Sequence, residues 1–311
     1  MKTVLTATIT AITLGLAGPA LAEYPEKPVT FVVPWPPGDL EDVLTRLIAE
    51  DFQAEYGVAA AVVNKPGGGG GPFPGAIDVA TAPSDGYVIG SFVPAVPLIG
   101  HEIGIPELNP EKFDPVGIFM TYPFVIATGG NAPYSNMHEL ASYAQDNDVV
   151  LGHFGDVLSP TQVTKALARK MEFSYASDAA FDALDCNTLA SGDADVINTT
   201  LQLILPCLDQ VKVLVSITGE RISKIPDTPT IAEVDSDLDI ALWNGLFVTK
   251  DTPQDVRAKI AAVAEKTMLG ERAQKVARET GALVYWIDAT DSAALIETDK
   301  TTLSAVGALL E

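Results

Sequence analysis

The sequence predicts an α/β protein of two doubly wound lobes, joined by a hinge and separated by a cleft. Short apolar runs of strand length alternate with segments of helical periodicity along the chain. This alternation restarts near residue 129, which predicts a second lobe. The 311 residues, 47% of them hydrophobic and 19% charged, are sufficient for about two domains with packed cores.

The first 22 residues predict a secretory signal peptide. Lys2 is followed by an apolar run over residues 4–16 and by small residues up to Ala22, where we expect cleavage. The apolar run is shorter than the ~20 residues of a membrane span; an uncleaved anchor helix is the alternative. We therefore expect a soluble periplasmic protein that begins near Glu23.

The acidic composition excludes several classes of partner. The chain has 41 acidic and 19 basic residues and a formal net charge of −22, which becomes −23 when Lys2 is removed with the signal peptide. Nucleic acids and anionic membrane surfaces repel a protein of this sign. We expect no nucleic-acid partner, no metal or other cofactor, and a monomer.

The first lobe is predicted to contain both ends of the chain, residues 23–128 and 238–311. Residues 29–33 form an apolar run rich in β-branched side chains, which is typical of a buried parallel strand. Residues 41–56 follow with apolar side chains at helical spacing and end at Gly57. The other elements expected here are strands at 59–63, 87–92, 242–248 and 283–287, two strand-like runs within 113–128, and helices at 76–80, 253–268, 271–280 and 290–310.

The second lobe, residues 129–237, is predicted as an insertion in the first. Its expected strands are 148–154, 195–199 and 212–217, and its expected helices are 137–145, 159–171, 181–190 and 201–208. An inserted lobe requires two chain crossings, which form a hinge and leave a cleft. Open α/β proteins usually bind their ligands in such a cleft.

Two cysteines remain in the predicted mature chain, Cys186 and Cys207. Export places them in an oxidising environment. A disulfide between them would close a loop of ~20 residues and contribute about 3 kcal/mol. Two buried free thiols are the alternative, and the sequence leaves both open.

Six motifs in order resemble those of the Bug-type solute receptors of tripartite tricarboxylate transporters. They are YPEKPVTFVVPWPPG at 24–38, NKPG at 64–67, PSDGY at 83–87, KIPDTPTIAE at 224–233, WNG at 243–245 and TP at 252–253. The resemblance covers nearly the whole mature chain. It implies a type II-like periplasmic binding protein that delivers a small organic acid to the membrane permease subunits of such a transporter, without catalysis.

The resemblance also implies where the ligand binds, on two loops that face each other across the cleft. The residues it indicates are Trp35, Pro36, Gly38, Asp39 and Asp42 in the first loop, His153, Phe154, Gly155 and Ser159 in the second, and Tyr175, Asn198 and Thr199 further along the second lobe. Each loop leads into a predicted helix, whose free N–H groups and partial positive charge can hold a carboxylate without lysine or arginine.

Acidic residues in the first loop depart from the family pattern. Asp39 and Glu41 stand where the family has glycine and a small residue. They are either a helix cap and a first-turn acid, or part of a pocket for a ligand with a cationic or hydroxyl-rich end, or for a metal-bridged acid. A sensor or an enzyme on the same fold is the alternative function. Its candidate catalytic groups are Asp39, Glu41, Asp42 and His153.

Overall fold

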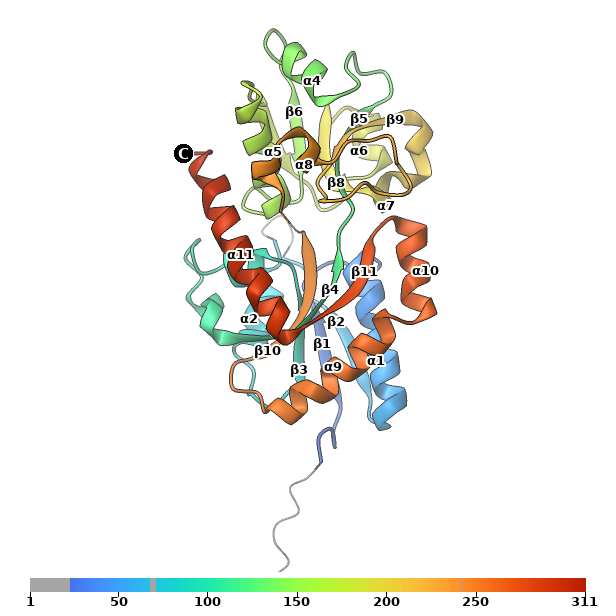
Figure 1. Cartoon of the computed structure of the whole chain (residues 1–311), viewed down its shortest axis with the longest axis vertical. Coiled ribbons are helices and arrows are strands. Elements are labelled where there is room, and N and C mark those ends of the chain that lie inside the picture. Colours follow the sequence, from blue (N-terminus) through green and yellow to red (C-terminus); the bar gives the residue numbers. More distant parts are fainter. Residues whose placement is uncertain (1–22, 68–70, 241) are drawn as a thin grey trace, which may run out of the picture.

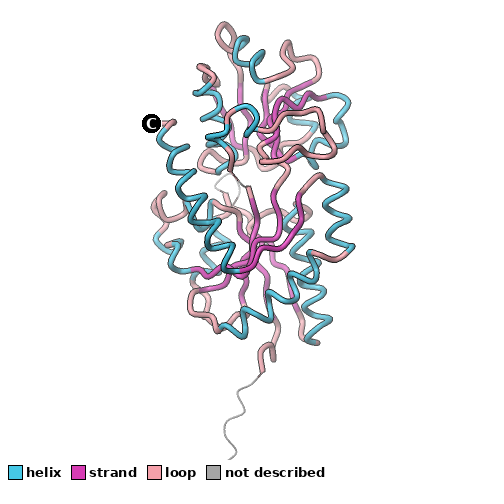
Figure 2. The backbone as a smooth tube through the Cα atoms, in the orientation of Figure 1, coloured by secondary structure: helices cyan, strands magenta, loops and turns pink. Residues whose placement is uncertain are grey.

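The computed structural model describes residues 23–67, 71–240 and 242–311 of the chain. The predicted signal peptide, residues 1–22, lies outside the described residues. Two lobes, each built on its own β-sheet, are stacked along the long axis of the molecule (Figures 1 and 2). This confirms the predicted two-lobed α/β fold. No helix among the described residues is both long enough and apolar enough to cross a bilayer.

The first lobe contains a six-stranded mixed sheet in the order β11-β4-β10-β3-β1-β2. Its strands are β1 (Val29–Val33), β2 (Ala60–Asn64), β3 (Val88–Phe92), β4 (Phe113–Thr121), β10 (Trp243–Thr249) and β11 (Leu283–Asp288). The strands β1, β2 and β3 run parallel, as the doubly wound pattern predicts. The strand β10 is antiparallel to both neighbours, β3 and β4. Its direction differs because it returns from the other lobe rather than through a crossover helix.

Helices cover both faces of this sheet. They are α1 (Leu40–Tyr56), α2 (Phe73–Ala80), α3 (Ala95–Leu98), α9 (Gln254–Met268), α10 (Glu271–Thr280) and α11 (Ala289–Ala308). The helices α1 and α9 bury their apolar side chains with Phe31 of β1, whereas α2 and α11 pack with Val32 on the opposite face. Alternate residues of one strand therefore enter two separate cores.

The second lobe contains a five-stranded sheet in the order β7-β6-β8-β5-β9. Its elements are the strands β5 (Phe124–Gly129), β6 (Val150–His153), β7 (Ser177–Ala180), β8 (Val196–Thr200) and β9 (Val211–Ser216), and the helices α4 (Met137–Tyr143), α5 (Ser159–Lys170), α6 (Cys186–Ser191), α7 (Leu201–Ile204), η4 (Leu205–Gln210), α8 (Ile231–Val234) and η5 (Ser236–Leu238).

The second lobe differs from the sequence prediction at two places. The predicted helix at 181–190 begins only at Cys186, and the preceding strand β7 was not predicted. The predicted lobe boundary at residue 129 would leave β5 in the first lobe, whereas β5 pairs with β8 and β9 of the second sheet. The chain therefore crosses earlier, between β4 and β5, because one apolar stretch supplies a strand to each sheet.

The two chain crossings lie side by side. The outward crossing passes through Tyr122 and Pro123, and the return lies between η5 and β10. The backbone N–H of Tyr122 donates to the carbonyl oxygen of Leu242 at 2.8 Å. The hinge is therefore two neighbouring segments joined by a main-chain hydrogen bond.

The C-terminal helix α11 forms a third link between the lobes. It starts on the first lobe and rises to the side of α5 in the second (Figure 1). An Arg169 guanidinium nitrogen donates to the Leu310 carbonyl oxygen at 3.2 Å, and Val306 is buried. The chain end is thus anchored to the lobe from which it does not originate.

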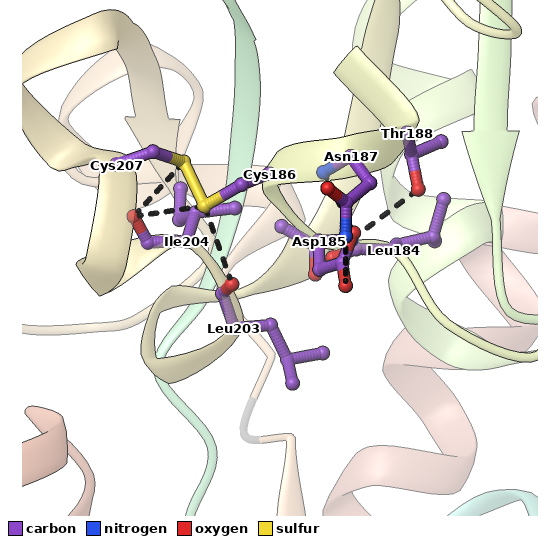
Figure 3. Close-up of a disulfide and its surroundings, with 9 residues drawn as sticks. Leu184, Asp185, Cys186, Asn187, Thr188, Leu203, Ile204 and Cys207 are labelled. Carbon is purple, nitrogen blue, oxygen red and sulfur yellow. Dashed lines mark hydrogen bonds between the residues drawn. A yellow bond between two sulfur atoms is a disulfide. The ribbon is translucent and has the colours of Figure 1, made fainter. Parts of the chain in front are cut away.

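Cys186 and Cys207 form a disulfide, with their Cα atoms 6.0 Å apart. The bond connects α6 to η4 within the second lobe (Figure 3). Of the two alternatives that the sequence left open, the structure therefore shows the bridge. The segment that it closes contains all of β8 and α7.

Candidate functional site

A cavity that is partly open to solvent lies between the lobes beside the hinge. Most of its lining is apolar, and both lobes and both crossing segments contribute to it. The lining residues are Trp35, Asp39, Glu41, Val93, Pro94, Ala95, Tyr122, Phe124, Phe154, Leu158, Ser159, Pro160, Thr200, Gln202, Leu203 and Leu242. None of these described residues is a lysine or an arginine.

Asp42 holds the first loop in place and does not line the cavity. Its carboxylate accepts from the Gly38 backbone N–H at 2.8 Å, from Arg46 at 2.8 and 3.0 Å, and from the Asn64 amide at 2.8 Å. Burial alone would raise the pKa of Asp42, but the hydrogen bonds from Arg46, Gly38 and Asn64 outweigh it and lower that pKa. Asn64 also donates to the carbonyl oxygen of Trp35. This network fixes the loop from Trp35 to Gly38 against α1.

Asp39 and Glu41 line the cavity instead of capping the helix. Asp39 occupies the N-cap position of α1, yet its side chain makes no capping hydrogen bond. Glu41, in the first turn, is 3% exposed. Burial and the charge of Asp39 raise the pKa of Glu41 to about 8, and burial and the charge of Asp42 raise the pKa of Asp39 to about 6. Two carboxyl groups thus lie in an apolar cavity, with no basic residue among those that line it.

A chain of buried hydrogen bonds connects Glu41 to the hinge and the sheet. The Tyr122 hydroxyl donates to Glu41 at 3.1 Å and accepts from the Asn244 amide at 3.0 Å. Ser91 donates to Asn244 at 2.7 Å, and Thr45 donates to Ser91 at 3.0 Å. The chain joins α1, β3, β10 and the outward crossing, so the position of Glu41 is coupled to both crossing segments.

The second loop leads into the N-terminus of α5. Ser159 is the first residue of this helix, and it is 2% exposed. Its hydroxyl oxygen is buried without a hydrogen-bond partner. Asn198 of β8 donates to Thr164 at 2.7 Å and to the Pro160 carbonyl at 3.3 Å, and so anchors the first turn of α5. The N-termini of α1 and α5 thus meet the same cavity from opposite lobes.

Aromatic side chains from both lobes form the walls. Phe154 packs edge-on against Phe124 with ring centroids 6.3 Å apart, and Trp35 lines the cavity from the first lobe. The indole nitrogen of Trp35 and the side-chain oxygen of Gln202 are buried without partners. Buried polar atoms are nearly always hydrogen-bonded in native proteins. Unpaired atoms in a cavity wall therefore indicate a place where a ligand or water supplies the missing partner.

The structure brings four of the twelve predicted site residues to the cavity wall, namely Trp35, Asp39, Phe154 and Ser159. Pro36, Gly38, Asp42 and Gly155 belong to the same loops but not to the lining. His153, Tyr175, Asn198 and Thr199 lie inside or behind the second lobe, and their contact with ligand stays a prediction. Asn198 and Thr199 instead hold other backbone segments, since Thr199 donates to the Leu184 carbonyl at 2.6 Å.

His153, Asp156 and Asp178 form a cluster with the spacing of metal ligands, with one ligand atom of each within 4.8 Å of the others. His153 Nε2 lies 2.8 Å from Asp178, and the Lys165 ammonium pairs with both aspartates. Lys165 therefore already supplies the cation of this cluster. Within the described part of the chain, Asp39, Glu41 and Asp42 do not form such a three-ligand group.

Most of the cavity lining escaped sequence reasoning. Glu41 is an exception, because one of the two interpretations of the first loop placed it with Asp39 in a pocket, and both residues line the cavity. Tyr122 precedes Pro123 in the break between two strand-like runs, and this break could have indicated the crossing between the lobes. Val93, Gln202 and Leu242 carried no local signal, because only the tertiary fold brings their segments together.

Two lobes, two hinge segments and a cavity walled by both lobes define the class of periplasmic solute-binding proteins. A family model described as "Tripartite tricarboxylate transporter family receptor" matches residues 44–309, and the chain belongs to this family. The family is one of substrate-binding receptors and not of enzymes. This confirms the resemblance found in the sequence motifs.

Individual relatives agree with this assignment. The chain is 26% identical over 277 residues to a protein from the tcbD–tcbE intergenic region of Pseudomonas sp. strain P51, a match that covers 84% of this chain and 80% of the relative. It is 26% identical over 235 residues to the protein BugT of Bordetella pertussis, with 71% and 70% covered.

Solved structures show the same fold. The periplasmic binding protein BugD is similar with a TM-score of 0.77 at 24% identity, covering 91% of this chain and 99% of that one. MatC from Rhodopseudomonas palustris with bound malate has a TM-score of 0.75 at 24% identity, with 93% and 100% covered. A further R. palustris protein, solved with adipate, has a TM-score of 0.79 at 22% identity, with 92% and 98% covered.

Proposed function

We propose that this protein is a periplasmic receptor that captures one small organic acid between its lobes and delivers it to the permease of a tripartite transporter. The observation that carries the proposal is the cavity beside the hinge, whose wall contains unpaired buried polar atoms from both lobes. A ligand that satisfies Trp35 on one side and Ser159 on the other favours the arrangement in which the lobes are close. Binding and closure are then the same event.

The α5 side of the cavity supplies the chemistry for a carboxylate. The N-terminus of α5 carries the partial positive charge of a helix dipole. Pro160 has no N–H and the Thr161 N–H donates to the Leu158 carbonyl oxygen, so the dipole and the Ser159 side chain supply the attraction. The Ser159 hydroxyl adds a donor that has no partner within the protein. Neighbours of the same fold were solved with the dicarboxylates malate and adipate. These observations together support a carboxylate at this end of the cavity.

The first test is binding of unmodified ligands by the predicted mature chain, residues 23–311. We expect one carboxylate-bearing compound to bind per chain, to raise the thermal midpoint, and to be recovered unchanged after long incubation. At a hundred times its Kd such a ligand adds about 2.7 kcal/mol. Turnover of the ligand would contradict the receptor role, and so would the absence of binding across mono-, di-, tri- and amino-carboxylates.

Closure and delivery require two further measurements. Small-angle X-ray scattering should show a smaller radius of gyration with ligand than without it, at the mass of a monomer. Transport by permease subunits in vesicles should require this protein together with the ligand. Ligand-dependent binding to a sensor protein, without transport, would replace the permease by a signalling partner.

A further inference from the structure

The cavity has opposite electrostatic character at its two ends. On the first-lobe side, Asp39 and Glu41 bring two carboxyl groups to the N-terminus of α1. On the second-lobe side, no acidic residue occurs among the described lining residues, and the N-terminus of α5 with Ser159 is left uncompensated. Between the two ends the wall is apolar, with Phe124, Phe154 and other hydrophobic side chains.

None of the described residues that line the cavity provides a cation for the acidic end. Arg46, the cation next to this loop, is already paired through two nitrogens with Asp42 and through one of them also with Asn64. The carboxyl group of Glu41 accepts hydrogen bonds from the Tyr122 hydroxyl and from its own backbone N–H, both of them neutral donors. The positive end of a helix dipole, equivalent to about half a charge, does not balance two carboxylates. Glu41 is buried and Asp39 is half-buried, so such an acidic pair is either partly protonated or matched by a cation from outside.

We propose that the ligand of this receptor is a small zwitterion, with a protonated amine at Asp39 and Glu41, a carboxylate at Ser159 and the α5 N-terminus, and an apolar carbon frame between them. The inference rests on the proposed receptor function and specifies its ligand class. The amine donates charge-assisted hydrogen bonds to the two carboxyl groups. The carboxylate accepts from the Ser159 hydroxyl, beside the positive end of the α5 dipole. A dicarboxylate would instead place a second negative charge against the acidic pair.

The release or uptake of protons on binding distinguishes an amine-bearing ligand from a dicarboxylate. Glu41, with a pKa raised to about 8, is largely protonated at pH 7 in the free protein. An ammonium group stabilises the carboxylate form, so its binding releases protons. A second carboxylate stabilises the acid form, so binding of a dicarboxylate takes up protons or none. The groups around Glu41 that enter this balance are Asp39, Asp42 and Tyr122.

The test compares matched ligands by isothermal titration calorimetry on residues 23–311. The pairs are 5-aminopentanoate with adipate and 4-aminobutanoate with glutarate, each titrated in two buffers of different ionisation enthalpy. We expect the amine-bearing member of at least one pair to bind about tenfold tighter or more than its partner, with proton release. Tighter binding of the amine-free member in every pair would overturn the inference and leave the receptor function standing. Absence of binding by all four compounds would overturn the inference, and absence of binding across the wider panel of mono-, di-, tri- and amino-carboxylates would overturn the receptor function as well.

Two variants test the assigned residues. In Glu41→Gln and in Asp39→Asn we expect the amine-bearing ligand to bind at least about tenfold more weakly, and proton release to fall or disappear. The double variant should gain affinity for adipate or glutarate. Glu50→Gln, which removes an exposed carboxyl group on the same helix, is the matched control and should leave binding unchanged. Unaltered amine affinity in both single variants would show that the amine lies elsewhere.

Discussion

The buried carboxyl group of Glu41 makes the stability of this protein depend on pH. In the folded chain its pKa is raised from 4.5 to about 8, chiefly because the side chain is buried and secondarily because Asp39 lies close. The folded state therefore retains a proton that the unfolded chain releases between these two values. This group contributes no penalty at pH 4, and stability falls progressively as the pH rises from 4.5 to 8.

Replacement of Glu41 by glutamine should therefore stabilise the ligand-free protein in a pH-dependent manner. We expect equal stability of Glu41→Gln and wild type near pH 4, and a gain of about 4 kcal/mol for the variant at pH 8. Urea unfolding at pH 4, 6 and 8 measures the difference. The control Glu50→Gln should show no gain that grows with pH. A gain of equal size at every pH would mean that Glu41 acts through packing and not through its charge.

Asn198 should affect ligand binding although it does not line the cavity. Its amide fastens the Pro160 carbonyl in the first turn of α5, so Asn198→Leu should lower stability by about 1–2 kcal/mol and weaken binding of a carboxylate-bearing ligand. Thr199→Val is the matched control, because it removes a buried hydrogen bond to Leu184 without touching α5. Calorimetry and urea unfolding of both variants separate the two effects. Equal losses of affinity would assign both residues to the general stability of the lobe.

At the scale of secondary structure, the sequence predicted those helices and strands whose hydrophobic pattern is clear. The helix α1 has Leu40, Leu44, Ile48 and Phe52 on one buried face and ends at Gly57, which adopts a left-handed conformation with φ of 70°. The strand β1 is an apolar run in the interior of its sheet. Both were predicted within a residue. For α1 the helical periodicity and the terminating Gly57 agree, and for β1 an unbroken apolar run ends at Pro34.

The strand β7 was missed for the opposite reason. Its sequence Ser-Asp-Ala-Ala is polar and small, and it lies at the edge of the second sheet, where its side chains are largely exposed. It is a strand only because it pairs with β6. The cavity lining was missed for the same reason. Its residues come from separate segments of both lobes, and no local sequence pattern predicts that these segments lie together.

The disulfide should matter for binding as well as for stability. The loop from Cys186 to Cys207 contains the cavity residues Thr200, Gln202 and Leu203. The double variant Cys186→Ala with Cys207→Ala should lose about 3 kcal/mol of stability, the entropy expected for a loop of this length, and should bind ligand several-fold more weakly. Reductant should reproduce both effects in the wild type and have none in the variant. Unchanged affinity would show that α7 keeps its position without the bond.

At the scale of the whole molecule, α11 sets a condition on lobe movement. Its C-terminal end contacts α5 through Arg169 and Leu310, although its own origin is on the first lobe. Any rotation that separates the lobes must break this contact or carry the helix end along. The contact therefore favours the arrangement in which both lobes wall the cavity.

Loss of this contact should shift the protein towards more open forms. We expect Arg169→Ala, and removal of residues 309–311, to enlarge the radius of gyration of the ligand-free protein and to weaken ligand binding several-fold. Small-angle scattering and calorimetry measure the two effects. Arg278→Ala, which removes an exposed ion pair with Glu271 within the first lobe, is the control. Tighter binding by either variant would mean that the contact favours the open form.

The nested order of the chain also determines how the molecule is assembled. The second lobe, from β5 to η5, is contiguous, whereas β4 finds its partners β10 and β11 only after that whole lobe in the chain. During synthesis the inner lobe is therefore complete while the outer one still lacks the middle of its sheet. Pulsed hydrogen exchange during refolding should protect amides of β6 and β8 before those of β4. Simultaneous protection would mean that the lobes fold as one cooperative unit. The first lobe can therefore complete its sheet only after the second lobe has folded. At that point the second lobe already presents its half of the binding site.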